Sequence, residues 1–391
     1  MPPINNRIAD LVPAVTEWRR DIHAHPELRY EERRTAAFVA AKLRGFGLDE
    51  VVEGVGGTGV VGVIRGQGTS DAVIALRCDM DALPIEEATG LDYASTSPGV
   101  MHACGHDGHT AMLLGAAQYL AETRRFAGTV VVVFQPAEEG GAGAKAMIDD
   151  GLLTRFGIER VFGMHNYPGM EAGTFGIRPG PMMAAADRIE IAITGKGAHA
   201  ARPHWGQDPV LAGAAIVQGV QQVVSRNVDP LEACVVSLTM FNAGFTDNVI
   251  PQEAHLKGTV RSLRPHIRDL AEARLAEIVE AIGRAHGVEA RLTYRRDYPV
   301  TANDATEAAF CAGIARDVAG EGAVDTDLVP VMGGEDFSFM LEERPGAFIF
   351  VGNGDSAGLH HPAYDFNDAI IPLGISYWTR LAEGSMPIEH A

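Results

Sequence analysis

The order of expected strands and helices between residues 187 and 296 places the strongest constraint on how this chain folds. Runs rich in β-branched residues alternate there with two helical patterns. The resulting β-α-β-β-α-β order is typical of a ferredoxin-like α+β domain. The expected elements are the strand Arg188–Thr194, the helix Pro209–Arg226, the strands Ala233–Phe241 and Glu253–Arg261, the helix Arg268–His286 and the strand Val288–Arg295.

The residues on either side follow a different rhythm, in which valine- and isoleucine-rich strands alternate with helices. This alternation predicts an α/β layer with chemistry-bearing loops at the strand ends. A chain of 391 residues can fill two cores. We therefore predict a larger α/β domain, residues 1–186 and 297–391, into which the ferredoxin-like domain, residues 187–296, is inserted. The expected flanking elements are helical sequence over 5–46 with a break near His25 and Pro26, the strands Thr58–Ile64, Ala72–Arg77, Thr129–Phe134, Arg160–Met164 and Ala347–Val351, and the helices Gly108–Thr123, Asp304–Val318 and Gly374–Glu383.

Charge and cysteine content restrict the partners and the compartment. The chain has 32 lysines and arginines against 51 acids, and its net charge of -19 repels nucleic acid and anionic lipid. We see no signal peptide, and no apolar run approaches the ~20 residues that span a bilayer. The four cysteines are widely scattered, as is typical of reduced thiols. We expect a soluble cytoplasmic protein that binds neither nucleic acid nor membrane.

Two short motifs suggest other activities but lack the required context. GVGGTG, Gly54–Gly59, has the spacing of a dinucleotide-binding loop, yet it precedes the strand-like run VVGVI where a helix is needed. A glycine-rich hairpin explains it better. GDSAG, Gly354–Gly358, has the spacing of a nucleophile elbow, yet LHHPAYD follows where a helix should begin. A serine esterase that uses Ser356 stays an alternative.

Side chains of the types that bind divalent metals occur at five places near strand ends or helix starts. Imidazole, thiolate and carboxylate are ligands that such metals accept, and a catalytic site leaves a position open for water. Each residue alone has an ordinary structural explanation, but their combination beside proline or glycine indicates a metal centre. The five places hold Asp79 and Asp81, Cys104 and His106, Glu138 and Glu139, His165, and His360 or His361.

The adjacent carboxylates Glu138 and Glu139 are the most specific feature of this set. Neighbouring side chains at a strand end point in different directions. One carboxylate can therefore bind metal while the other acts on water as a general base. The ligand set implied by the resemblance given below does not require His102 or His109, and we expect local hydrogen bonding or support of a ligand from both.

The chain resembles the dinuclear metallo-aminoacylase and carboxypeptidase superfamily, in the amidohydrolase branch that contains hippurate hydrolases, N-acyl-L-amino-acid amidohydrolases and auxin-conjugate hydrolases. The resemblance covers nearly the whole chain, in the family's order. It implies that the inserted domain is a lid or dimerisation domain, and that the protein is a homodimer or a tetramer. The matching blocks are RRDIHAHPELRYEE, LRCDMDALPI, MHACGHDGHTAMLLGAA, FQPAEEG, GMHN, GKGAHAARPHWGQDPV, NVIPQEAHLKGTVRS, MGGEDFSFM and LHHPAYDFND.

The resemblance also implies a metal site. Two divalent ions, of zinc, manganese, nickel or cobalt, are expected on five ligands. Cys104 stands where many relatives have a bridging aspartate, and its thiolate is expected to bridge the ions or lie between them. Glu138 corresponds to the general base, and Asp81 to the aspartate that orients a ligand histidine. The roles of Asp79, Glu335 and Asp336 stay open. The implied ligands are Cys104, His106, Glu139, His165 and His360, the last chosen over His361.

On the substrate side, the resemblance implies that His199 stabilises the oxyanion, often in the partner subunit's site. Asn248 and Arg261 are expected to hold the substrate carboxylate, and Gly333 to allow close approach of the backbone. The implied reaction is hydrolysis of a hippurate-like or N-acetyl L-amino acid to a carboxylate and a free amino acid. A metallo-dipeptidase or carboxypeptidase with the same site, and a metal-dependent binding protein without catalysis, are the alternatives.

Overall fold

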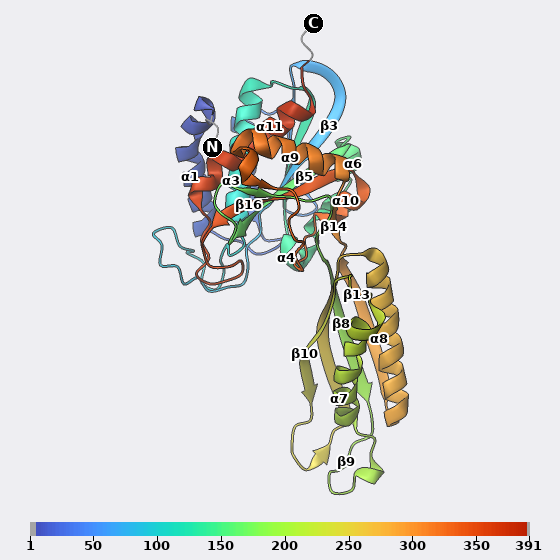
Figure 1. Cartoon of the computed structure of the whole chain (residues 1–391). Helices are drawn as coiled ribbons and strands as arrows, with labels where there is room; N and C mark the ends of the chain where they lie inside the picture. The colour runs from blue at the N-terminus through green and yellow to red at the C-terminus, as the bar shows by residue number, and fades with distance from the viewer. Residues whose placement is uncertain (1–4, 389–391) are drawn as a thin grey trace. The chain divides into compact units, whose positions relative to one another are not determined.

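The structure is a computed structural model that describes residues 5–388, and these residues form two compact units (Figure 1). Unit 1 consists of residues 5–182, 302–329 and 336–388, and unit 2 of residues 183–301 and 330–335. The predicted fold class, an α/β part with an inserted ferredoxin-like α+β part, is confirmed. The assignment of these parts as catalytic and lid or dimerisation domains stays a prediction.

Unit 1 is built on an eight-stranded mixed sheet with the order β1-β2-β4-β3-β5-β16-β6-β15. Its centre is parallel, because β3, β4, β5 and β16 run in the same direction. Four consecutive parallel strands bring four carboxyl ends to one edge of the sheet. The strands are β1 (Glu50–Val55), β2 (Gly59–Arg65), β3 (Gly68–Asp79), β4 (Ala127–Gln135), β5 (Arg160–Pro168), β6 (Phe175–Gly176), β15 (Val324–Asp325) and β16 (Gly346–Gly354).

The GVGGTG motif lies in the turn of an antiparallel hairpin between β1 and β2. Gly54, Gly56 and Gly57 have φ angles of 82°, 66° and 107°, which only glycine adopts readily. The motif leads into a strand, so the hairpin interpretation is confirmed and a dinucleotide loop is excluded.

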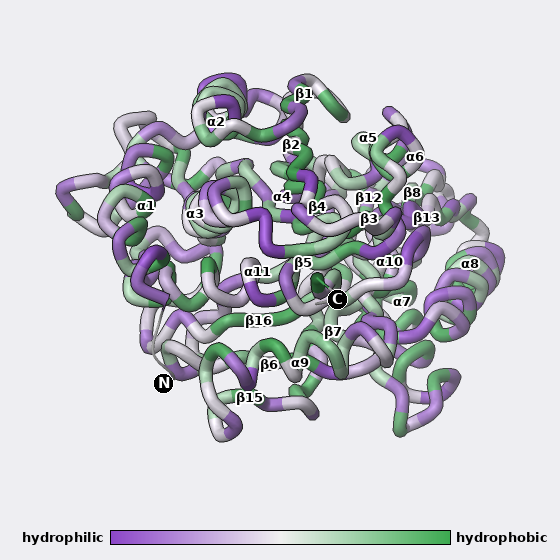
Figure 2. Tube along the Cα trace, turned by 90° about the horizontal axis from the view of Figure 1, so that it is seen from above, coloured by the Kyte–Doolittle hydropathy of each residue, from purple (hydrophilic) through white to green (hydrophobic). Residues whose placement is uncertain are grey.

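The central strands are hydrophobic on both faces, and helices cover them. Figure 2 shows β5 and β16 as mainly hydrophobic segments, and β16 is buried from Gly346 to Asn353. Helix α3 is buried along almost its whole length, as expected for a central helix that packs against α1 and α11. The helices of this unit are α1 (Asn6–Ala24), α2 (Arg33–Gly45), α3 (His106–Thr123), α4 (Glu138–Gly141), α5 (Gly143–Asp149), α6 (Leu152–Arg155), α9 (Ala305–Ala319), α10 (Ser338–Glu343) and α11 (Ile371–Ser385).

Unit 2 has a four-stranded antiparallel sheet with the order β10-β12-β8-β13, and α7 and α8 pack against it. Alternate residues of β8, including Ile189, Ile191 and Ile193, are buried, as expected for a sheet with one covered face. The elements are β8 (Ala185–Thr194), β9 (Ala198–His199), α7 (Pro209–Gly219), β10 (Cys234–Ala243), β11 (Val249–Ile250), β12 (Glu253–Ser262), α8 (Pro265–His286) and β13 (Glu289–Tyr298), with β7 (Gly180–Met183) and β14 (Thr301–Asn303) at the ends of the segment.

Most element boundaries differ from the expected ones by a few residues. The helix expected over Pro209–Arg226 ends at Gly219, and the chain then forms a π-helical turn at Val223–Asn227. The helix expected from Arg268 begins at Pro265, because proline fits the first helical turn. In the described part of the chain, every helix is too short or too polar to cross a bilayer.

Candidate metal centre

The predicted metal ligands lie near the carboxyl ends of the central parallel strands of unit 1. Glu139 follows β4, His165 lies near the end of β5, and His360 follows β16. Cys104 and His106 belong to the turn that begins α3. Gly105 allows this turn, because its φ angle is 88° and a Cβ there would lie 2.3 Å from Asn166 Oδ1. Five residues from four separate segments of the sequence thus lie at one edge of the sheet.

The side chains of the five predicted ligands converge. One ligand atom each from Cys104, His106 and Glu139 lies within 4.8 Å of the others. The Cys104 Sγ is 3.5 Å from Nε2 of His165, and the His360 Nε2 is 3.0 Å from Oε1 of Glu139. His361, which the residue pattern left as an alternative, instead accepts a hydrogen bond from the Ala363 amide through Nδ1.

The protonation of two histidines is fixed by main-chain carbonyl groups. His106 Nδ1 lies 2.8 Å from the Asp81 carbonyl oxygen, and His165 Nδ1 lies 2.7 Å from the Asn166 carbonyl oxygen. A carbonyl oxygen only accepts, so each Nδ1 donates its proton, and Nε2 is the ring nitrogen left to bind a metal ion. The His106 Nε2 is buried and has no hydrogen-bond partner among the described residues. A metal ion would satisfy it, so the donor set fits a divalent metal.

The electrostatics of the cluster favour a positive charge. Burial lowers the pKa of His106, but the negative charges of Asp79 and Asp81 outweigh burial and raise it to about 10. Burial, together with the carboxylates of Glu139 and Glu138, raises the pKa of the Cys104 thiol well above its usual range. A thiolate can form at this position only when a cation lies beside it. Burial keeps the pKa of His165 well below its usual range, so that ring is neutral and able to bind metal.

Asp81 holds the paired glutamates through their backbone. Its carboxylate accepts hydrogen bonds from the amides of Glu138 at 3.0 Å and Glu139 at 2.9 Å. Because its carbonyl oxygen also orients His106, one residue sets the direction of the expected general base and of two expected ligands. The Asp336 amide adds a hydrogen bond of 3.3 Å to Oε1 of Glu138.

The other two histidines of the HACGHDGH motif behave differently from each other. His109 lies 2.7 Å from Asp79 through Nδ1 and 3.0 Å from the Asn166 amide through Nε2, so hydrogen bonds to residues distant in sequence occupy both nitrogens. His102 is buried, and neither ring nitrogen has a hydrogen-bond partner among the described residues. Local hydrogen bonding, one of the two roles expected for His102, is therefore absent among the described residues, and support of a ligand stays a prediction. Burial lowers its pKa to about 3, so the ring is neutral.

A buried ion-pair network under the site was missed from the sequence. Arg77 is fully buried and donates to Asp79 at 2.8 Å, to Gln135 at 2.8 Å and to Asp336 at 3.0 Å. Asp336 also accepts from the Ala144 amide at 2.9 Å. The network connects β3 and β4 with Asp336, and it gives the carboxylates of Asp79 and Asp336 a shared cationic partner. The one available signal was a charged residue within an otherwise apolar strand.

The predicted substrate-binding residues all lie in unit 2. His199 and Asn248 are neighbours, because β9 pairs with β11 and the Ala200 amide donates to the Asn248 carbonyl oxygen at 3.0 Å. Arg261 lies near the carboxyl end of β12, where it pairs with Ala186 of β8. Its guanidinium group donates a hydrogen bond to the Val260 carbonyl oxygen at 3.2 Å. Gly333 lies in the segment 330–335. The roles of these four residues stay predictions.

The GDSAG motif lacks the context of a nucleophile elbow. The Ser356 hydroxyl hydrogen-bonds to Asn353 and to the Ala357 carbonyl oxygen, and no helix begins over 355–367 of the described chain, so a nucleophile elbow is not formed.

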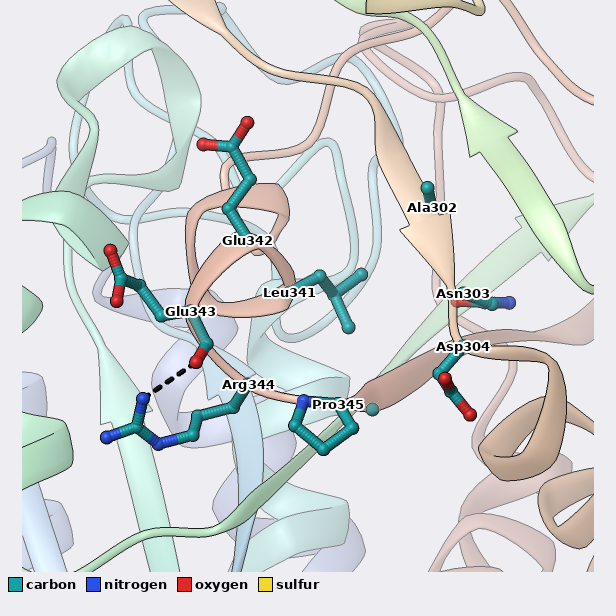
Figure 3. Close-up of a pocket in the computed structure, with 9 residues that line it drawn as sticks. Ala302, Asn303, Asp304, Leu341, Glu342, Glu343, Arg344 and Pro345 are labelled. Carbon is teal, nitrogen blue, oxygen red and sulfur yellow. Dashed lines mark hydrogen bonds between the residues drawn. The ribbon is translucent and has the colours of Figure 1, made fainter.

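A surface hollow of about 400 Å³ lies between Ala302–Asp304 and Leu341–Gly346 (Figure 3). It contains none of the predicted site residues, and Arg344 beside it donates to the Glu343 carbonyl oxygen.

A parallel α/β sheet with imidazole, thiolate and carboxylate groups at its strand ends defines a metal-dependent hydrolase class. Residues 75–384 match the sequence model of Peptidase family M20/M25/M40, and the chain belongs to this family. It is 43% identical to a hippurate hydrolase of Campylobacter jejuni over 96% of this chain and 97% of that protein. It is 42% identical to an N-acetyl-L-cysteine deacetylase of Bacillus subtilis, over 90% and 83%. A dinuclear metal-binding peptidase of the same family from Bacillus subtilis has 34% identity and a TM-score of 0.85, over 97% of this chain and 100% of that one.

Proposed function

We propose that this enzyme hydrolyses the amide bond of N-acyl-L-amino acids to a carboxylate and a free amino acid. The relatives named as a hippurate hydrolase and an N-acetyl-L-cysteine deacetylase support this substrate class, since both names describe cleavage of an acylated amino group. The observation that carries the proposal is the orientation of His106 and His165, whose Nδ1 atoms donate to main-chain carbonyl groups so that Nε2 is left to bind metal beside Cys104 and Glu139.

The proposed cofactor is a pair of divalent ions held by Cys104, His106, Glu139, His165 and His360. When bound, such ions would polarise the acyl carbonyl group and acidify the attacking water. Zinc, manganese, nickel and cobalt all accept this mixture of nitrogen, oxygen and sulfur ligands. The dinuclear relative supports the number of ions, and Cys104, whose Sγ is 3.5 Å from His165 Nε2 and clusters with Glu139, would supply a thiolate ligand.

Glu138 is the proposed general base. Its carboxylate accepts a proton from the attacking water and later donates that proton to the nitrogen of the departing amino acid. The backbone amide of Glu138 is held by Asp81 and one carboxylate oxygen by the Asp336 amide, so the side chain is positioned before substrate binds. Its side chain is almost fully buried, which strengthens its interactions with developing charge.

The substrate contacts are proposed to come from two copies of the chain. His199 stabilises the oxyanion, while Asn248 and Arg261 bind the substrate carboxylate. Asn248 adjoins the beginning of β12 and Arg261 lies near its end, eight residues beyond Glu253, which corresponds to about 26 Å at ~3.3 Å per residue. A small substrate would not span that distance, which favours contributions from two copies of the chain. This supports a homodimer or a tetramer as the active form.

Two paired substitutions test the proposed site. Glu138→Gln should retain the metal content of the wild type and lose about 10²- to 10⁴-fold in kcat, the contribution typical of a positioned base. Glu139→Gln should lose bound metal, because it removes an anionic ligand. Both are measured on the metal-reconstituted enzyme with hippurate, N-acetyl amino acids and dipeptides as substrates. Wild-type turnover in Glu138→Gln would contradict the assignment, and preference for dipeptides would favour the peptidase alternative. Stoichiometric metal without turnover on any substrate would favour a binding protein.

A further inference from the structure

The loop that carries Glu138 and Glu139 has a strained backbone. Ala137 and Ala142 have φ angles of 53° and 55°, in the left-handed region that alanine rarely adopts. Glu139 between them has non-helical angles, and Gly140 has a φ angle of 75°. We call residues 137–142 the catalytic loop. A backbone of this kind persists only when its surroundings hold it, and the strain is typical of a functional site.

Three side chains from one distant segment hold the catalytic loop. Glu32 accepts a hydrogen bond from the Ala137 amide at 2.9 Å. Arg29 donates to the Glu139 carbonyl oxygen at 2.9 Å, and Tyr30 donates its hydroxyl to the Gly141 carbonyl oxygen at 2.7 Å. We call Arg29, Tyr30 and Glu32 the clamp residues. They bind alternate residues of the loop, on both its donor and its acceptor groups, from more than 100 positions away in the sequence.

Glu32 could instead serve only to cap a helix, because it occupies the N-cap position of α2. An N-cap side chain normally accepts from the first amides of its own helix. Glu32 makes no such bond. Glu27 accepts from the amides of Arg34 and Thr35 instead, at 2.9 Å and 2.8 Å. The Glu32 carboxylate is therefore fully used elsewhere, with Thr58 donating to its second oxygen and Ala137 to its first.

The burial of Glu32 makes its hydrogen bond with the Ala137 amide energetically important. The side chain is completely buried, and burial raises its pKa. A buried carboxylate is tolerated where its oxygens receive hydrogen bonds, and a buried amide such as that of Ala137 is costly to leave unpaired. Removing Glu32 would release the Ala137 amide next to Glu138, and the loop would relax from its strained conformation.

We propose that Arg29, Tyr30 and Glu32 are positioning residues of the hydrolytic reaction, which hold the catalytic loop so that Glu138 and Glu139 point into the metal centre. They act through the loop backbone, to which each of them makes a hydrogen bond. The rate effects rest on the proposed function. The backbone effect does not, because the clamp contacts join only groups of the chain itself.

The test compares Glu32→Ala with Glu32→Gln and with a matched control, Glu27→Ala. Glutamine keeps an acceptor for the Ala137 amide, and its amide group can donate to the Thr58 hydroxyl, so Glu32→Gln should retain the clamp. Glu27→Ala removes the side chain that caps the first amides of α2 in the same stretch, and it leaves the hydrogen bonds to the catalytic loop in place. Tyr30→Phe removes only one hydroxyl group from a partly exposed side chain, so it keeps the test informative if Glu32→Ala does not fold.

Two measurements are made. In the metal-free protein, hydrogen–deuterium exchange of peptides covering 136–145 should be faster than wild type in Glu32→Ala and Tyr30→Phe, and unchanged in Glu32→Gln and Glu27→Ala. In the metal-reconstituted enzyme with an N-acyl amino acid, Glu32→Ala should lose about 10- to 100-fold in kcat, as expected for a misplaced catalytic group. Its KM should stay within about twofold, since substrate is bound by other residues.

Loop exchange as slow in Glu32→Ala and Tyr30→Phe as in the wild type would overturn the proposal. Equal losses of kcat in Glu27→Ala and Glu32→Ala would also overturn it, because the effect would then be general destabilisation. If the wild type hydrolysed no N-acyl amino acid, the proposed function would fail, while the exchange data would still decide whether the clamp exists.

Discussion

His23 should make the stability of unit 1 depend on pH. This histidine is fully buried on α1, with Nδ1 2.9 Å from Asp107 and Nε2 3.3 Å from Glu87. Burial lowers its pKa, but the carboxylates of Asp107 and Glu87 outweigh burial and raise the pKa to about 9. Asp107 directly follows His106 at the beginning of α3, so the ion pair also ties α1 to the turn that carries two expected ligands.

The direction and size follow from the two pKa values. The folded state binds the His23 proton more tightly than the unfolded state, whose histidine has a pKa of 6.5. The stabilisation is therefore fully present below pH 6.5 and is lost as the pH rises through about 9. A rise from 6.5 to about 9 corresponds to about 3 kcal/mol of unfolding free energy, an order-of-magnitude value for a buried group.

The assay is urea unfolding of the metal-free protein at pH 6, 7.5 and 9, comparing the wild type with His23→Gln. The chain has three tryptophans, and Trp18 and Trp378 lie in unit 1. In a Trp205→Phe background, fluorescence therefore reports unit 1 alone. Other titrating groups are common to both proteins and cancel in the difference. The free-energy difference should be largest at pH 6 and shrink by about 3 kcal/mol towards high pH. A difference that stayed constant from pH 6 to 9 would refute the reasoning.

Two further predictions concern the buried network and the active form. Arg77→Met removes the cation shared by Asp79 and Asp336 and should cost about 3–5 kcal/mol of unfolding free energy, whereas Arg7→Met at an exposed ion pair should cost less than about 1 kcal/mol by the same urea assay. Co-expression of Glu138→Gln with His199→Ala on differently tagged chains should restore about half of the wild-type kcat in the purified mixed dimer, because one of its two sites is complete when His199 acts on the partner's site. An inactive mixed dimer would place His199 in its own chain's site, and wild-type turnover in the His199→Ala homodimer would place it outside the reaction.

The parts of the site that could be predicted are those in which residue type and chain position carry the signal. Glu138 and Glu139 follow an apolar strand, and parallel strands of this length bring their ends together, so residue chemistry alone indicated a metal centre at this edge. Residue chemistry did not separate His360 from His361. The family resemblance made that choice, and the 3.0 Å separation of His360 from Glu139 supports it.

The contacts that could not be predicted join residues far apart in the sequence. Glu32 looks like a helix cap, and only the folded chain shows that its carboxylate serves Ala137, 105 residues away. Arg77 and Asp336 are 259 residues apart, and each has a plausible local explanation in its own segment. Such pairs depend on the sheet order, which a single sequence determines weakly because many strand arrangements satisfy the same hydrophobic pattern.

The orientation of the ligand histidines is a different case, because the orienting groups are backbone atoms. His106 is held by the carbonyl oxygen of Asp81 and His165 by that of Asn166. Any residue can supply a carbonyl oxygen, so no side-chain pattern marks these acceptors in the sequence. The position of the Asp81 acceptor follows from where β3 ends, and a change in the register of β3 would move it away from His106 without changing any ligand side chain. The metal-binding capacity of this centre is therefore a property of strand register as much as of the five ligand side chains.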